Sequence, residues 1–164
     1  MSRFVPLLLL VALTACDGNK APAADPAEAV SESAAVDPAA KPGLTLTGGR
    51  LVLPAVKGNP AAVYFSLVNG SDKAATLAAV DIAGAGMAML HETTQVDGHS
   101  TMAEMKDPVI APGATLVLAP GGKHVMLDGV PEDWKPGGTA ELTLVFADGD
   151  KLSAPLKVEA PGGD

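Results

Sequence analysis

Short apolar runs separated by polar, turn-forming residues make up most of the chain from Gly43 onward. Each run is only a few residues long, which suits β-strands better than helices. No stretch between turns carries the apolar stripe with a 3.6-residue period that marks an amphipathic helix. We therefore expect strands at residues 44–46, 51–53, 62–68, 76–82, 114–118 and 142–146.

The separators between these runs consist of residues with known turn chemistry, namely Gly, Pro, Asn and Asp. They are Gly48-Gly49, Asn59-Pro60, Asn69-Gly70, Asp97-Gly98, Pro112-Gly113, Gly121-Gly122, Pro136-Gly137-Gly138 and Asp148-Gly149. About seven to nine short strands over roughly 118 residues are typical of an all-β, antiparallel Greek-key sandwich or barrel. We expect one such domain over residues 43–160, followed by a short tail at 161–164.

The amino-terminal segment has a different pattern. Arg3 precedes an apolar run and the small residues Thr14 and Ala15, as in a secretory signal peptide. A helix over this run would reach only about 18 Å, well short of the ~30 Å hydrocarbon core of a bilayer. Leu13-Thr14-Ala15-Cys16 resembles a bacterial lipobox, which implies a signal peptide at 1–15 and lipidation of Cys16. The alternative is a plain secretory signal with an unmodified cysteine.

Residues 16–42 are rich in Ala and Pro and have almost no large apolar side chain. Such a segment cannot bury enough surface to fold, so we expect a disordered tether between the lipid anchor and the domain. Asp17, directly after Cys16, resembles an inner-membrane retention signal of some Gram-negative bacteria. These features predict a periplasmic protein, anchored by lipid and favouring the inner membrane.

Composition excludes several classes of function. The chain has 11 Lys and Arg against 19 Asp and Glu, a net charge of −8, and no basic run, so we do not expect it to bind nucleic acid. Cys16 is the only cysteine, so the folded domain can have no disulfide, thiolate metal site or cysteine nucleophile. No Ser/His/Asp or paired-carboxylate motif stands out, and we expect a monomer that is not an enzyme.

Histidine and methionine cluster in the second half of the chain. All three His and five of the six Met lie between Met87 and Met126. Met89-Leu90-His91 and His124-Val125-Met126 are mirror images, and in a strand each His would share a face with its Met. Hard cations disfavour thioethers, whereas copper(I) accepts both imidazole and thioether ligands. The pattern therefore predicts a copper(I) site.

The spacing of four of these residues resembles a known family. His91, Met102, His124 and Met126 match the pattern His-x10-Met-x21-His-x-Met of the PCu(A)C periplasmic copper chaperones. The resemblance implies a cupredoxin-like β-sandwich that binds one copper(I) ion through these four side chains. It also implies delivery of copper to a recipient, either a cytochrome c oxidase subunit with its CuA centre or a thiol copper carrier.

Several other residues could contribute to the site. We expect Met87 and Met89 to serve in packing, with a second-sphere or alternative-ligand role as the other option. We expect His99 to lie in a solvated loop after the Asp97-Gly98 turn, with contact to copper as its alternative. Met105 could replace Met102 if the register slips, and Glu92 could orient the imidazole of His91 by a hydrogen bond.

Three alternatives to this function remain open at the level of sequence. Met102 and Met126 could fill gaps in the core, with the two His satisfied at strand ends. The protein could store or detoxify copper in the periplasm rather than deliver it. It could also be a lipid-anchored β-sandwich that binds a protein partner without any metal.

Overall fold

The computed structural model describes residues 41–162, and all regular secondary structure in this range is β-strand. The strands are β1 (Leu44–Val52), β2 (Ala61–Asn69), β3 (Ala75–Ile82), β4 (Ala88–Val96), β5 (His99–Glu104), β6 (Val109–Ile110), β7 (Thr115–Leu118), β8 (Lys123–Leu127), β9 (Thr139–Phe146) and β10 (Lys151–Glu159). No helix long and apolar enough to cross a membrane occurs in these residues. The predicted signal peptide at 1–15, Cys16 and the tether up to residue 40 lie outside the described residues, as do residues 163 and 164.

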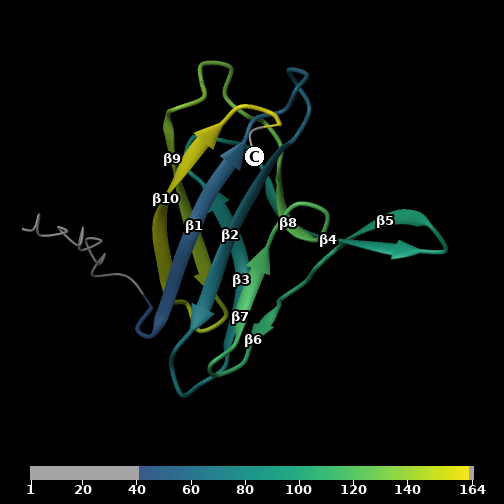
Figure 1. The fold of residues 1–164 in the computed structure, drawn as a ribbon. Coiled ribbons are helices and arrows are strands. Elements are labelled where there is room, and N and C mark those ends of the chain that lie inside the picture. The colour runs from purple at the N-terminus through teal and green to yellow at the C-terminus, as the bar shows by residue number, and fades with distance from the viewer. Residues whose placement is uncertain (1–40, 163–164) are drawn as a thin grey trace, which may run out of the picture. The chain divides into compact units, whose positions relative to one another are not determined.

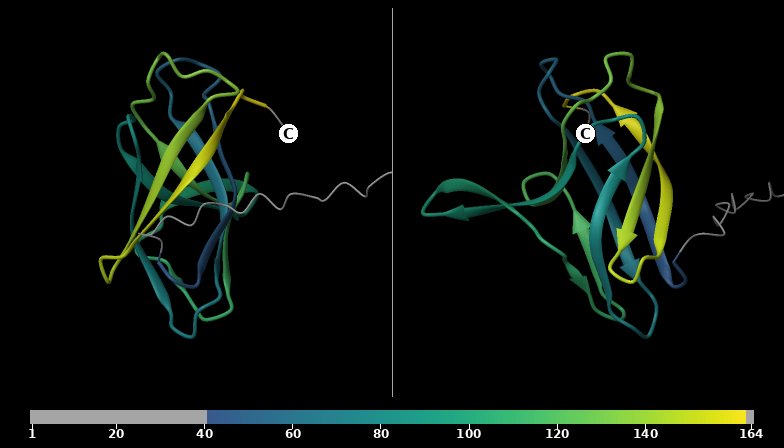
Figure 2. Two further views of the ribbon diagram at one scale, coloured as in Figure 1. Left: turned by 90° about the vertical axis from the view of Figure 1, so that its left-hand side faces the viewer. Right: turned by 180° about the vertical axis from the view of Figure 1, so that it is seen from behind.

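The strands form one continuous hydrogen-bonded path in the order β5-β4-β8-β2-β1-β10-β9-β3-β6, and β7 also pairs with β2. The pairing of β1 with β10 is parallel, and every other pairing is antiparallel. The path curls around a single apolar interior, so that the strands form two facing layers (Figures 1 and 2). The all-β sandwich predicted from the sequence is confirmed.

Strict alternation along the strands generates the core. In β2 every second side chain is buried and the intervening ones are only partly covered, because successive side chains of a strand point to opposite faces. Leucine supplies most of the interior, together with two phenylalanines. The largest fully buried side chains are Phe65, Phe146, Leu51, Leu67, Leu77, Ile82, Leu127, Leu142, Leu144, Leu156, Val63 and Val125.

One predicted turn is wrong. Gly48-Gly49 was expected to separate two strands, but β1 runs through both residues as a single strand with an irregularity in its register against β2 between Thr47 and Arg50. Gly48 has φ of +65°, a conformation that only glycine adopts without strain. The two glycines therefore form a bulge within a strand, which is a common use of glycine in sheets.

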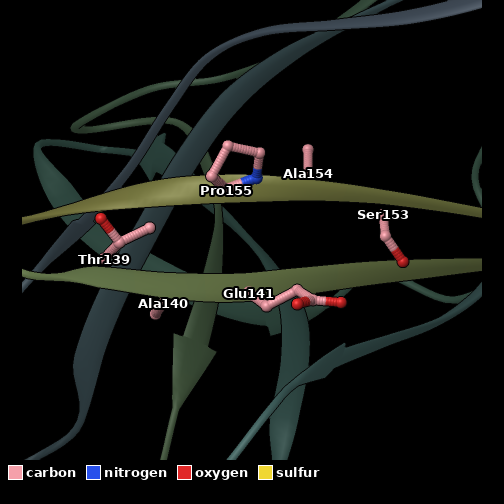
Figure 3. A pocket seen from close by; sticks show the side chains of 6 residues that line it. All are labelled: Thr139, Ala140, Glu141, Ser153, Ala154 and Pro155. Carbon is pink, nitrogen blue, oxygen red and sulfur yellow. The ribbon is translucent and has the colours of Figure 1, made fainter. Parts of the chain in front are cut away.

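The structure has ten strands rather than seven to nine, because several strands lack a clear apolar run. β10 is one of these, and Pro155 interrupts its pattern. Proline cannot donate a backbone hydrogen bond to a neighbouring strand. This is tolerated because β10 pairs with β1 only from Lys157 onward. A hollow of about 370 Å³ lies over this part of β9 and β10, and Figure 3 shows the side chains that line it, Pro155 among them.

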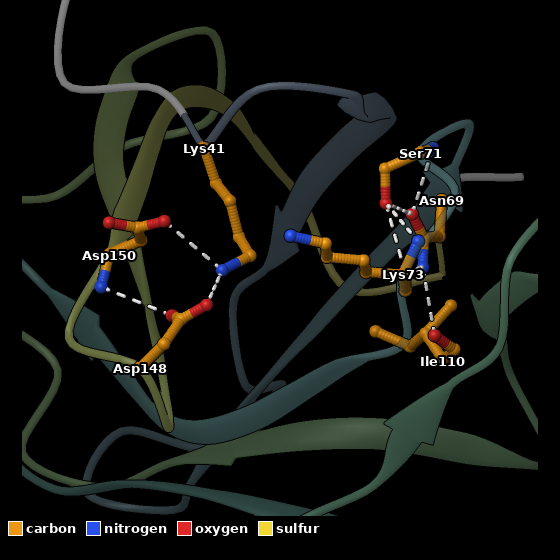
Figure 4. Close-up of polar contacts among 7 residues, drawn as sticks. All are labelled: Lys41, Asn69, Ser71, Lys73, Ile110, Asp148 and Asp150. Atoms are coloured by element: carbon orange, nitrogen blue, oxygen red, sulfur yellow. Dashed lines mark hydrogen bonds and ion pairs between the residues drawn. The ribbon is translucent and has the colours of Figure 1, made fainter.

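A buried asparagine fixes the corner at the end of β2. Asn69 is fully buried, and its amide nitrogen donates to the carbonyl oxygens of Lys73 (2.7 Å) and Ile110 (2.9 Å). Its side-chain oxygen accepts hydrogen bonds from the backbone nitrogen (3.1 Å) and hydroxyl (2.7 Å) of Ser71 (Figure 4). One side chain thus joins the β2–β3 turn to the end of β6.

An exposed ion cluster ties the start of the described chain to the β9–β10 turn. The Lys41 ammonium forms ion pairs with Asp148 and Asp150 (Figure 4). It also lies over the ring of Phe146. The hydrogen bond from Lys41 lowers the pKa of Asp148. Desolvation opposes protonation of Lys41, but the hydrogen bonds to the two aspartates outweigh it and raise the pKa of this lysine. The cluster is solvent-screened, so its contribution to stability is small.

We predict that Asn69→Ala lowers the free energy of unfolding by about 3 kcal/mol, since two carbonyl oxygens lose their donor in a buried corner. Urea unfolding of the two proteins measures this difference. Ser71→Ala is the matched control and should cost less than about 1 kcal/mol, because Asn69 keeps both of its donor interactions. Equal effects of the two substitutions would contradict this assignment of the corner's stability to Asn69.

Candidate metal centre

The pairing of β4 with β8 brings four sulfur and nitrogen donors onto one face of the sheet. Met89 lies directly opposite Met126, and His91 lies directly opposite His124. Directly opposed residues of an antiparallel pair share a face, as do residues two apart on one strand. The four side chains therefore form two adjacent rows, one of two methionines and one of two histidines.

The residues between them fix which face this is. Leu90 and Val125 form the intervening pair, and both are buried in the core, at 8% and 0% exposure. Because side chains alternate, the methionine and histidine rows must lie on the outer face. All four of these side chains are partly exposed there. None of these side chains packs in the core, so Met126 does not fill a gap there.

Strand β5 supplies Met102 to the same face. Met102 lies opposite Thr93 of β4, one position along the outer face from His91. Its sulfur is 3.2 Å from Nδ1 of His91, and its side chain is 53% exposed. The two imidazole rings are 6.0 Å apart between centroids and meet edge to face at 87°. The structure thus places His91, Met102, His124 and Met126 on one face, and their role as copper ligands stays a prediction.

A backbone contact orients the second imidazole. Nδ1 of His124 is 3.0 Å from the carbonyl oxygen of Gly122, which can only accept a hydrogen bond. Nδ1 therefore carries the proton, and Nε2 is left with a free lone pair for a metal ion. Gly122 belongs to the turn before β8, so this turn sets the ring orientation.

Glu92 does not have the role expected from its neighbour His91. It lies opposite Lys123 and forms an ion pair with that residue at 2.9 Å. Residues 91 and 92 point to opposite faces of β4, so the carboxylate is directed away from the imidazole of His91. The acid that shares the outer face is Glu104, which lies opposite His91 on β5.

Two of the other donors lie elsewhere. His99 pairs with Val96 at the far end of the β4–β5 hairpin, on the face opposite to Met102. Met105 is partly buried and packs against the core, so it is not a substitute for Met102. Met89, for which packing was expected and an alternative-ligand role was left open, lies opposite Met126 on the outer face. The mirror symmetry of Met89-Leu90-His91 and His124-Val125-Met126 contained the signal, but the strand register was needed to read it.

The hairpin that carries Met102 projects from the sandwich (Figures 1 and 2). β4 pairs with β8 only as far as Glu92, and beyond that point its partner is β5 alone. Every residue of β5 is exposed. Asp97 and Gly98 close the hairpin with φ of +51° and +79°, as a two-residue type I′ turn requires. The centre therefore joins a fixed part, on β8 and the inner half of β4, to an exposed arm.

Thioethers are the donors that lie beside the two imidazoles on this face. Within residues 41–162, no three His, Cys, Asp or Glu side chains lie close enough together to hold a metal ion. A mixed set of imidazole and thioether donors favours copper(I) over zinc, calcium or magnesium.

The chain is similar in sequence to a family of lipoproteins. Residues 44–158 match the family model described as "Putative lipoprotein LpqE-like". The putative lipoprotein Lxx21020 of Leifsonia xyli subsp. xyli is 38% identical over 91 residues. Protein RP573 of Rickettsia prowazekii is 28% identical over 124 residues, 75% of this chain. The chain spans 54% and 64% of the lengths of these two relatives, respectively, and the first match covers 54% of this chain.

Solved structures are similar over most of the described residues. A copper-bound PCuAC domain from PmoF2 is 25% identical with a TM-score of 0.60, and the match covers 77% of this chain and 97% of that domain. The solution structure of CuI-DR1885 from Deinococcus radiodurans is 29% identical with a TM-score of 0.58, covering 80% and 85% of the two chains. Both structures contain copper according to their descriptions.

Proposed function

The chain belongs to the LpqE-like lipoprotein family and contains a PCuAC-like copper-binding domain, and from this premise we propose that it is a periplasmic copper(I) chaperone. In this proposal it binds one copper(I) ion through His91, Met102, His124 and Met126. It then passes the ion to a recipient by ligand exchange. It catalyses no reaction.

The approach of nitrogen to sulfur between β4 and β5 is the observation that carries this proposal. A metal ion bonded at about 2.0 Å to a nitrogen and about 2.3 Å to a sulfur, with a tetrahedral angle between the two bonds, holds these donor atoms about 3.5 Å apart. Nδ1 of His91 and the sulfur of Met102 are 3.2 Å apart. An ion can therefore enter between them with a shift of a few tenths of an ångström. His124 and Met126 complete the donor set from the neighbouring strand.

The chemistry of the donors suits a carrier rather than a permanent metal site. All four donors are uncharged and none is a thiolate, so the bound ion keeps most of its positive charge. Half of the Met102 side chain is open to solvent. A donor group of a recipient can approach this side and take the place of one chaperone ligand while the others still hold the ion, so the ion is never free. The absence of cysteine after residue 16 also argues against a blue-copper electron carrier.

The recipient in this proposal is the CuA centre of a cytochrome c oxidase subunit, reached directly or through a thiol copper carrier. Membrane attachment through lipidated Cys16 would keep the chaperone near a membrane-embedded oxidase. The family description as a lipoprotein supports attachment outside the cytoplasm, and the choice of the inner membrane rests on Asp17.

We predict that His124→Ala weakens copper(I) binding by at least about a hundredfold, the cost of a lost ligand of about 2.7 kcal/mol. Competition with a chromophoric copper(I) chelator under anaerobic conditions measures the affinity. His99→Ala is the matched control, because His99 is an imidazole of the same hairpin that faces away from the centre, and it should bind as the unaltered protein does. Unchanged binding by His124→Ala would refute the proposed ligand set.

Delivery to oxidase is tested in cells. We expect deletion of the gene to lower cytochrome c oxidase activity in copper-poor medium, and added copper or the intact gene to restore it. The gene encoding His124→Ala should fail to restore activity in copper-poor medium. If deletion instead leaves oxidase activity intact and makes cells sensitive to excess copper, the protein stores or detoxifies copper and the delivery proposal is wrong.

A further inference from the structure

Met89 lies beside the proposed copper site but is not one of its four proposed ligands. It shares the outer face of β4 with His91 and lies directly opposite Met126. Opposed residues in an antiparallel pair have Cβ atoms about 4.5–5.5 Å apart, so the two thioethers can reach a common ion. Five donors thus surround a position where copper(I) uses at most four.

The five donors lie on two sides of the histidine pair. Met102 reaches His91 from β5, at the root of the projecting hairpin. Met89 and Met126 lie on the other side, where β4 is paired with β8 and both strands belong to the sandwich. Because Met102 is half exposed and lies on an exposed strand, it is the ligand that a recipient reaches first.

Met89 is not held in the core. It is partly exposed on the outer face opposite Met126, and it borders a hollow of about 280 Å³ between β3 and β4. Met105 borders the same hollow but packs against the core. Methionine has three rotatable bonds, and its side chain adapts easily to irregular surroundings.

We propose that Met89 is a reserve thioether ligand, which binds copper(I) when a recipient draws Met102 away. This inference rests on the proposed function. In the exchange, the bond from copper to the Met102 sulfur breaks and a bond to the Met89 sulfur forms. Both sulfurs are neutral, so no proton or electron moves and copper stays monovalent. The ion then keeps four ligands, held by the rigid part of the sheet, while the hairpin engages the recipient.

The test is a double-mutant cycle with Met89→Leu and Met102→Leu, which remove sulfur but keep the apolar volume. If either thioether can replace the other, each single substitution weakens copper(I) binding less than about fivefold, and the double substitution weakens it at least about fiftyfold. Met87→Leu is the matched control. It removes an exposed methionine just before β4 and should leave the affinity unchanged in both backgrounds.

The ε-methyl NMR signals of the methionines report the exchange directly. Titration of the full-length Met102→Leu protein with copper(I) should shift the signals of Met89 and Met126 and leave that of Met105 in place. A silent Met89 signal at saturation, with a double substitution no weaker than Met102→Leu alone, would overturn the reserve-ligand proposal. The proposed function would survive that result as long as His124→Ala still loses copper, so the two failures are distinguishable.

Discussion

The register between β4 and β8 determines which side chains of these two strands share the outer face at the proposed copper site. Leu90 and Val125 oppose each other and are buried, and burying each of these side chains contributes about 2 kcal/mol. A slip of β4 by one residue would turn Leu90 into solvent and push His91 and Met89 into the core, where an unpaired imidazole nitrogen is costly. Hydrophobic burial on one face therefore holds the two donor rows together on the other.

This constraint explains how a domain without thiols can present a soft metal site. The sandwich supplies a fixed pair of strands, and the β4–β5 hairpin adds one further donor from an exposed arm. The Gly122 carbonyl fixes the proton of His124 and so leaves one nitrogen available. Rigid donors on the sandwich and a reachable donor on the hairpin are what stepwise ligand exchange requires. Met89 can act as the proposed reserve ligand because it lies on the part of β4 that is paired with β8.

Much of the fold could be predicted from the sequence because its core strands alternate cleanly and end at turn residues. Leu142–Phe146 is an example, and the Asp97-Gly98 hairpin turn is another. Gly48-Gly49 was wrongly predicted to form a turn, because a pair of glycines can form either a turn or a β-bulge. Only the pairing of β1 with β2 distinguishes the two. β10 was missed because Pro155 breaks its pattern. The proline is tolerated within the strand because β10 pairs with β1 only from Lys157 onward.

The site was predictable to a similar extent. The spacing of four His and Met residues identified the donors that the structure brings together. The spacing could not show which residue lies across from which, so Met89 was assigned to packing and Glu92 to the orientation of His91. The surroundings of both residues depend on cross-strand register, which is set by long-range burial rather than by local sequence.

X-ray absorption at the copper edge of the protein loaded with one equivalent of copper(I) tests the central claim most directly. The account predicts two imidazole nitrogens and two thioether sulfurs around the ion. A coordination shell of nitrogen and oxygen alone would contradict it, because the shared outer face of β4, β5 and β8 would then not be the place where copper binds.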